Sequence, residues 1–136
     1  MKENLLESIY KQGYPDAQTA PLVSLEEFFE GNEDEGSIGC NLIDHPGVSF
    51  FYEVLLEIRN KENVQDVFVE IMEVEDEEYW PFSERIYVLT DAKVAEVKQW
   101  MSILEPDEID EGYAFGKPSA APELKLGYHV IGAWWD

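Results

Sequence analysis

Cys40 carries the one thiol of the sequence, and His45 and His129 are the side chains best suited to act as its base near neutral pH. His45 lies five residues after Cys40, which allows proximity, but no local sequence of a known thiol enzyme surrounds the pair. A lone cysteine between Ile38 and Leu42 is more often a small buried hydrophobic residue. We therefore predict a structural role for Cys40 and no catalytic residue. A small enzyme that uses Cys40 with a histidine is an alternative.

A metal site is the second chemistry that these residue types allow. The sequence has no C-x-x-C, H-x-x-x-H or H-E-x-x-H spacing. The stretch E-G-N-E-D-E-G-S-I-G-C-N at 30–41 is as rich in oxygen ligands and glycine as a calcium loop. With Gly36 at the sixth position of such a loop, however, Gly31 and Leu42 take its first and twelfth positions, which require ligands. No metal or other cofactor is predicted; an enzyme that uses carboxylates with a divalent ion is a further alternative.

The charge balance restricts the partners. Thirty acidic residues against nine basic ones give a formal net charge of -21. This charge repels phosphate backbones and anionic membrane surfaces, so neither nucleic acid nor a membrane is an expected partner. A basic protein, attracted by electrostatic steering, is the partner that the charge favours, although solubility alone would explain the same balance.

The acids are clustered, and aromatic residues adjoin the clusters. Three acidic groups lie at 26–35, 73–78 and 105–111, each in a connection or at the end of a predicted element. Aromatic anchors surrounded by charge are typical of protein interfaces, whereas a strand that ends in Trp-Trp would equally place one ring in the core. The residues predicted to bind a partner are Glu33, Asp34, Glu35, Glu75, Asp76, Glu77, Glu78, Tyr79, Trp80 and Trp135.

Periodicity and capping signals predict the elements that must position these groups. Ser24 followed by Glu27 is a capping box, and Asp44 with Pro46 resembles a second helix start. Residues 107–122 are rich in glycine and proline, and we expect a long irregular loop there. The predicted helices are 3–12, 24–29, 44–59 and one capped by Thr90 or Asp91 that ends before Pro106. The predicted extended segments are 20–23, 37–43, 65–74, 86–89 and 128–135.

These elements predict an α+β fold, with helices packed on one face of a mostly antiparallel sheet in a two-layer sandwich. Strands 65–74 and 86–89 are expected to pair across a long exposed connection. The length of 136 residues suits a single globular domain over 1–136. The N-terminal residues do not resemble an export signal, and a lone cysteine fits a reducing compartment, so the expected location is cytoplasmic.

Four segments of the chain resemble a small bacterial family of single-domain proteins without an established activity. They are P-L-V-S-L-E-E-F-F-E-G-N from Pro21, G-S-I-G-C-N from Gly36, W-P-F-S-E-R-I-Y-V-L-T from Trp80, and the closing A-W-W-D. A looser similarity, in size and acidity, is to the immunity proteins of bacterial toxin systems.

The function hypothesis that combines these observations is a non-catalytic acidic binding protein of the immunity or inhibitor type. Its acidic residues would steer a basic protein such as a toxin, its aromatic residues would anchor it, and the mechanism would be occlusion. A general protein-interaction domain without an inhibitory role is the remaining alternative.

Overall fold

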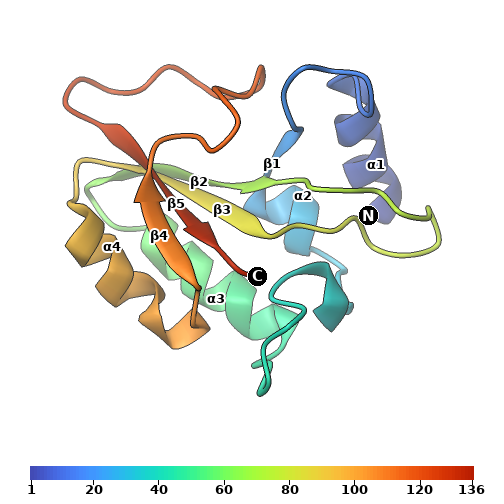
Figure 1. Ribbon diagram of the computed structural model, residues 1–136, viewed down its shortest axis with the longest axis horizontal. Helices are drawn as coiled ribbons and strands as arrows, with labels where there is room; N and C mark the ends of the chain where they lie inside the picture. The colour runs from blue at the N-terminus through green and yellow to red at the C-terminus, as the bar shows by residue number, and fades with distance from the viewer.

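A five-stranded antiparallel sheet forms the centre of the computed structural model, which describes residues 1–136 (Figure 1). The strand order is β1-β2-β3-β5-β4, so β1 and β4 are the two edges. The elements are α1 (Lys2–Lys11), β1 (Leu22–Ser24), α2 (Leu25–Phe29), a 3-10 turn (Glu35–Ser37), α3 (Val48–Arg59), β2 (Val64–Glu70), β3 (Arg85–Thr90), α4 (Val94–Met101), a 3-10 turn (Ser102–Leu104), β4 (Glu108–Glu111) and β5 (His129–Trp134). The α+β class predicted from the sequence is confirmed.

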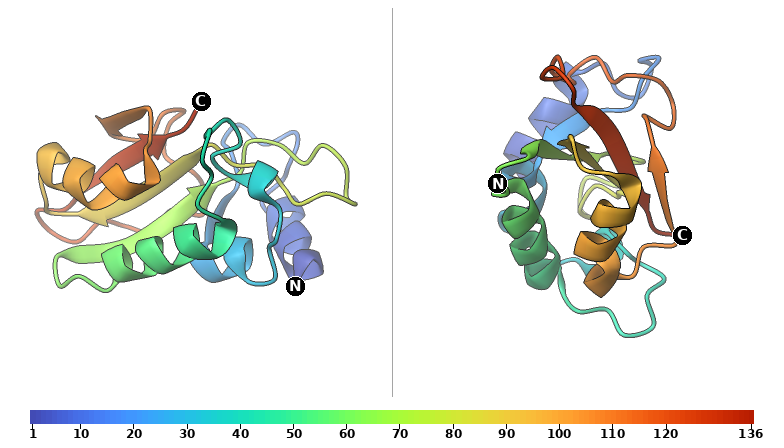
Figure 2. Two further views of the ribbon diagram at one scale, coloured as in Figure 1. Left: turned by 90° about the horizontal axis from the view of Figure 1, so that it is seen from below. Right: turned by 90° about the vertical axis from the view of Figure 1, so that its left-hand side faces the viewer.

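The helices α2, α3 and α4 cover one face of the sheet, while α1 packs beside α2 and β1 (Figure 2). The stripe of α3 that faces the sheet consists of Val48, Phe51, Leu55 and Ile58, all buried. These side chains meet Val67, Val69 and their neighbours on the inner face of the sheet in one large hydrophobic core. Burial of such apolar area contributes roughly 25 cal/mol per Å² and is the main stabilising term of the fold.

The other face of the sheet is covered by a long loop rather than by helices. The loop 112–128 crosses it and places Tyr113 and Ala121 against a second, smaller apolar cluster (Figure 1). That cluster comprises Leu22, Tyr87, Leu89 and Val130. Within the loop, Ser119 N–H donates to Thr19 Oγ1 at 3.3 Å, which joins the loop to the turn after α1. The outer face is therefore built by segments about one hundred residues apart in the chain.

The capping box at α2 forms as predicted. Glu27 N–H donates to Ser24 Oγ at 3.0 Å, and Ser24 N–H donates to Glu27 Oε1 at 2.9 Å. These two bonds satisfy backbone donors that a five-residue helix would otherwise leave without partners. Arg59 of α3 donates from both terminal guanidinium nitrogens to the Glu26 carboxylate in the same turn, with Nη1 2.7 Å from Oε1, and this fixes α2 on α3.

The predicted strand at 37–43 is wrong. Asp34 Oδ1 accepts the Gly36 N–H at 2.9 Å and caps a 3-10 turn instead. Gly39 then takes a φ of +62°, where a Cβ would lie 2.9 Å from Leu42 Cδ1 and 3.0 Å from Phe51 Cζ. This left-handed glycine reverses the chain, so Ile38 enters the core from a turn while Ile43 is 98% exposed.

Two predicted helix starts are also wrong. The helix α3 begins after Gly47, with a φ of +101°, and not at Asp44. His45 organises this start, because its Nδ1 accepts the Gly47 N–H at 2.9 Å while its Nε2 bonds Ile38 O at 2.8 Å. The helix α4 begins at Val94, since the Thr90 hydroxyl instead donates to Asn63 O and accepts the Ala92 N–H.

The predicted irregular loop at 107–122 contains a strand. Residues 108–111 pair with β5, from Glu108 opposite Trp134 to Glu111 opposite Ile131. Only Ile109 of this strand is buried, so the segment lacks the apolar alternation that marks a strand in sequence.

The strand β2 is shorter than predicted and ends at Glu70. No helix of this fold has the length and apolar character that crossing a bilayer would need.

Candidate functional site

Two acidic segments that are distant in sequence meet at one surface groove of about 720 Å³. One is the segment 34–40 before α3, and the other is the β2–β3 connection, residues 71–84. We call this site the acidic groove. It is lined by Asp34, Gly36 and Cys40 from the first segment and by Glu73, Glu75, Asp76, Tyr79, Trp80 and Phe82 from the second. The structure therefore brings together two of the three predicted acidic clusters.

The groove carries negative charge without a neighbouring cation. Its carboxylates are those of Asp34, Glu73, Glu75 and Asp76, and none of the ion pairs of the structure includes any of them. No lysine or arginine lines the groove. Carboxylates gathered in one hollow repel one another, and a cationic group of a partner would relieve that repulsion.

The β2–β3 connection is a fixed element. Its base extends the hairpin, because Met72 N–H donates to Phe82 O at 2.8 Å and Phe82 N–H donates to Glu73 O at 2.8 Å. At its tip, Glu78 N–H donates to Asp76 Oδ1 at 2.9 Å in a tight turn. Asp76 thus shapes the turn as well as lining the groove.

Three of the hydrogen bonds that join the connection to the rest of the fold are made by aromatic side chains. Tyr10 of α1 donates its hydroxyl to Glu77 at 2.8 Å, and this bond raises the pKa of Tyr10. Val74 N–H donates to the Tyr14 hydroxyl at 3.0 Å, and Trp80 Nε1 donates to Phe28 O at 2.9 Å. A surface held in this way loses little conformational freedom when a partner binds.

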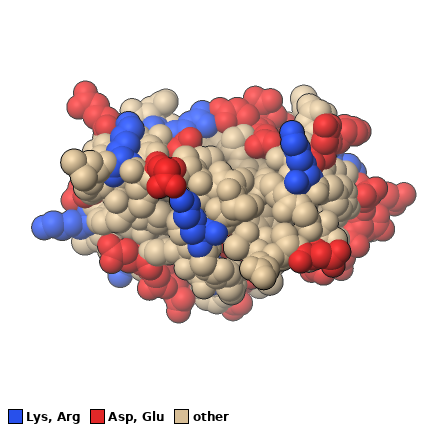
Figure 3. All heavy atoms as spheres, turned by 90° about the horizontal axis from the view of Figure 1, so that it is seen from above, with Lys and Arg blue, Asp and Glu red and all other residues tan.

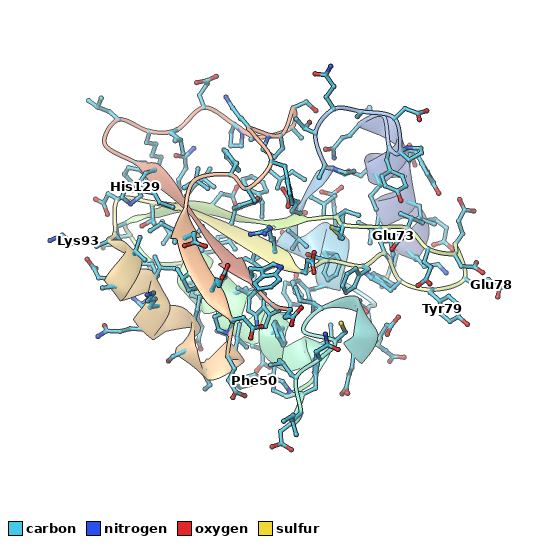
Figure 4. All side chains as sticks on the ribbon, viewed as in Figure 1. Phe50, Glu73, Glu78, Tyr79, Lys93 and His129 are labelled. Carbon is cyan, nitrogen blue, oxygen red and sulfur yellow. The ribbon has the colours of Figure 1, made fainter.

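The predicted aromatic anchors have three different environments. Tyr79 is 64% exposed and extends outward at the tip of the connection beside Glu78, while Glu73 lies nearer the sheet (Figure 4). Trp80 is half-buried and packs against the main core, so it fixes the groove and shows only part of its ring. Trp135 is 1% exposed, and its Nε1 donates to Leu104 O at 2.8 Å. The prediction that Trp135 contacts a partner is wrong, because the core contains this ring.

The other predicted site residues lie around the groove. Glu33 and Glu35 are exposed on the loop before the 3-10 turn, and Glu77 and Glu78 are exposed at the tip of the connection. These four add to the field near the groove without lining it. Phe82 lines it although it was not predicted to bind a partner. The third acidic cluster lies elsewhere, along a separate hollow of about 490 Å³ lined by Lys98, Ser102 and residues 105–110.

The structure does not pair Cys40 with a histidine. Cys40 is exposed on the wall of the acidic groove, so the prediction of a buried structural thiol is wrong. Both ring nitrogens of His45 are occupied by the backbone at Ile38 and Gly47, which leaves this imidazole no free position. His129 lies at the far end of the sheet, where its ring faces Ala92 O and Glu111 (Figure 4). The structure contains no group of three or more His, Cys, Asp or Glu side chains that could hold a metal ion.

A buried carboxylate that the sequence did not single out lies on the loop-covered face of the sheet. Glu70, at the end of β2, is 4% exposed, and the Tyr87 hydroxyl donates to its Oε2 at 3.0 Å. Arg85 Nε lies 3.9 Å from its Oε1. Burial raises the pKa of Glu70, and burial also raises the pKa of Tyr87. In sequence, Glu70 is one acid among thirty, and its only unusual feature is that it interrupts a β-branched strand.

The fold and the groove define a small α+β protein with a preformed acidic surface lined by aromatic rings. Residues 1–133 match the family model of the Uncharacterized protein YfbO family. The chain is also 42% identical over 117 residues to the Uncharacterized protein YfbO of Escherichia coli (strain K12), an alignment that covers 85% of this chain and 83% of that protein. The chain belongs to the YfbO family, which confirms the resemblance to an uncharacterised bacterial family. No solved structure matches the chain.

Proposed function

We propose that this protein is a non-catalytic binding protein of the inhibitor or immunity type, which docks its acidic groove on a basic protein. The observation that carries the proposal is the meeting of 34–40 and 73–82 around an aromatic hollow that contains four carboxylates and no cation. If the acidic residues served solubility alone, they would not be expected to converge around aromatic side chains. A single cysteine favours a reducing compartment such as the cytoplasm, so we propose that the interaction takes place there.

The parts of the groove have different roles in this proposal. The carboxylates attract and orient the partner, and steering of this kind raises association rates by about ten- to a thousandfold. Tyr79, with an exposed ring and a hydroxyl, inserts into the partner, and Phe82 and the visible part of Trp80 form the apolar floor. The partner's own site is inhibited by occlusion, since the anchored connection cannot move aside.

Two charge-matched variants test the proposal. The first, Glu73→Gln with Glu75→Gln and Glu78→Gln, neutralises two carboxylates that line the acidic groove and an exposed one beside it. The second, Glu105→Gln with Glu108→Gln and Asp110→Asn, removes the same charge at the third cluster. The tagged wild-type protein is used at low salt to capture its partner from its source, and the association rate of the purified partner is then measured with each variant.

We expect the captured protein to be basic and the first variant to associate at least about tenfold more slowly, while the second is affected much less. The association rate of the wild-type protein should fall steeply as salt is raised, because exposed charges are screened beyond about 8 Å at physiological ionic strength. Equal slowing by the two variants, or an association rate that is independent of salt, would contradict docking through the groove.

A further inference from the structure

A second groove lies on the opposite side of the β2–β3 connection from the acidic groove. It has a volume of about 340 Å³ and is bounded by the turn after α1, by the end of β2 and by Phe115 of the loop 112–128. Figure 3 looks down on the turn after α1 and the loop 112–128 and shows uncharged surface between them. The carboxylates are most dense toward α1 and the β2–β3 connection. We call this site the Glu70 groove, after the single carboxylate among its lining residues.

Glu70 is incompletely satisfied where it meets this groove. The Tyr87 hydroxyl donates to Oε2, whereas no hydrogen bond in the structure reaches Oε1. The nearest cationic atom to Oε1 is Arg85 Nε at 3.9 Å, which is beyond hydrogen-bond distance. Oε1 is not among the fully buried polar atoms that lack a partner, so this oxygen of an otherwise buried carboxylate is still reached from solvent at the groove.

The neighbouring protein groups are held in place and cannot supply that donor without rearrangement. The Arg85 guanidinium carbon lies 5.4 Å from the centre of the Phe115 ring and 5.8 Å from that of Trp134. The Tyr87 hydroxyl already uses its O–H to donate a hydrogen bond to Glu70 Oε2, and it accepts the Ala114 N–H at 3.1 Å. Oε1 is therefore open to a donor that approaches from the groove.

The local charge favours a cationic donor. Glu84 is close enough to act electrostatically on Glu70, and Arg85 is the one cation within ion-pair distance of Glu70. A charge-assisted hydrogen bond to a carboxylate is about twice as strong as a neutral one, so an ammonium is favoured over a neutral donor. The remaining walls, among them Pro15, Met72 and Phe115, suit an apolar or aromatic body.

We propose that the Glu70 groove binds a small organic amine, with its ammonium group hydrogen-bonded to Glu70 Oε1 and its apolar body between Pro15, Met72 and Phe115. The volume matches the lower end of the range for small-molecule pockets, about 300 to 1,000 Å³. The site shares no lining residue with the acidic groove, so it stands independently of the function proposed above.

The test is a titration of the isotope-labelled full chain followed by NMR at neutral pH, with 2-phenylethylamine as the probe. Two compounds of similar shape are the controls: 2-phenylethanol, which carries a neutral donor, and phenylacetate, which carries a negative charge. The amine should give saturable shifts of the Ile71, Met72 and Phe115 amides, and the two controls should not. The absence of saturation at millimolar amine, or equal binding of the alcohol, overturns the proposal.

Variants separate this site from general attraction of cations to an acidic protein. Glu70→Gln keeps the shape of the side chain and an acceptor for Tyr87, and it should weaken amine binding at least about tenfold. Phe115→Ala changes a residue that is 57% exposed, so it tests the groove even if Glu70→Gln does not fold, and it should also weaken binding. Glu75→Gln at the acidic groove should have no effect. Equal amine-induced shifts at residues 75–78 would show nonspecific attraction and contradict the proposal.

Discussion

The indole Nε1 of Trp80 donates a hydrogen bond to the backbone oxygen of Phe28 at 2.9 Å and thereby ties the β2–β3 connection to α2. The same oxygen also accepts Asn32 Nδ2 at 3.3 Å. Trp80 was predicted to contact a partner, but this bond makes it first a support for the shape of the acidic groove. The exposed charge beside it is held in place by an aromatic ring that packs against the core.

Replacing Trp80 with phenylalanine should keep most of the packing and lose this hydrogen bond. We expect the free energy of unfolding, measured by urea denaturation, to fall by about 1 kcal/mol, and no more than this because Asn32 still satisfies the Phe28 oxygen. Tyr79→Ala at the exposed tip is the control and should change stability by less than about 0.5 kcal/mol. A larger loss from Tyr79→Ala than from Trp80→Phe would show that the roles of the two rings are reversed.

Trp135→Ala should be among the most destabilising single changes. The ring is buried, contacts Phe51 with a centroid separation of 5.6 Å, and donates to Leu104 O. Truncation leaves a large cavity and an unpaired carbonyl, so we expect a loss of about 3–5 kcal/mol in the free energy of unfolding. The neighbouring Trp134→Ala, at a half-buried position, should cost less. A loss near zero for Trp135→Ala would place this ring at the surface, as first predicted.

Cys40→Ser should leave the fold almost unchanged. Because the thiol is exposed on the groove wall, the change leaves no core cavity, and we expect an effect within about 0.5 kcal/mol. A thiol reagent should modify the native protein at its single cysteine without unfolding it. Reaction only after urea is added would instead indicate that the thiol is buried.

The pH dependence of the free energy of unfolding should reflect the raised pKa of the Glu70 carboxyl. Burial raises its pKa above the ordinary value of 4.5, so the folded chain binds this proton more tightly than the unfolded chain does. The contribution of Glu70 to stability is therefore greatest below about pH 4.5 and declines as pH rises toward the folded-state pKa. Glu70→Gln cannot titrate, so the unfolding free energy of the variant minus that of the wild-type protein should rise with pH across this window.

Urea denaturation of both proteins at a series of pH values measures this difference, and subtraction removes the contribution of the other acidic residues. A difference that is constant with pH would mean that the two states bind the Glu70 proton equally. A difference that falls as pH rises would mean that Arg85 and Tyr87 stabilise the carboxylate more than burial penalises it.

The sequence predicted those features that depend on local signals. Ser24 and Glu27 form a capping box that needs only four residues, and the spacing of Val48, Phe51, Leu55 and Ile58 specifies the buried face of a helix. The strand β4 was missed because an edge strand buries only one face, here through Ile109, and its backbone pairing with β5 leaves no pattern in the residue types. Gly39 lies within the segment 37–43 that the sequence predicts to be extended, although its left-handed conformation is what turns the chain.

The candidate sites depended on contacts between distant segments. The acidic stretches and Tyr79 could be identified as exposed from sequence, but their meeting at one groove depends on how the segment 34–40 and the β2–β3 connection fold onto α2 and α3. The burial of Glu70 could not be predicted from the sequence. The loop 112–128 covers its face of the sheet, and the residues of this loop show no periodicity that would indicate such a cover. Trp135 was assigned to the surface because it lies next to the chain terminus, whereas the strand continues its alternation into the core.

The two sheet edges bear on how this chain avoids self-association. The edge strand β1 has only three residues, and the opposite edge, β4, carries exposed Glu108, Asp110 and Glu111. Two copies that met through β4 would bring rows of carboxylates against each other, and like charges on paired strands are unfavourable. The acidity of β4 therefore acts as a barrier to polymerisation into extended sheets.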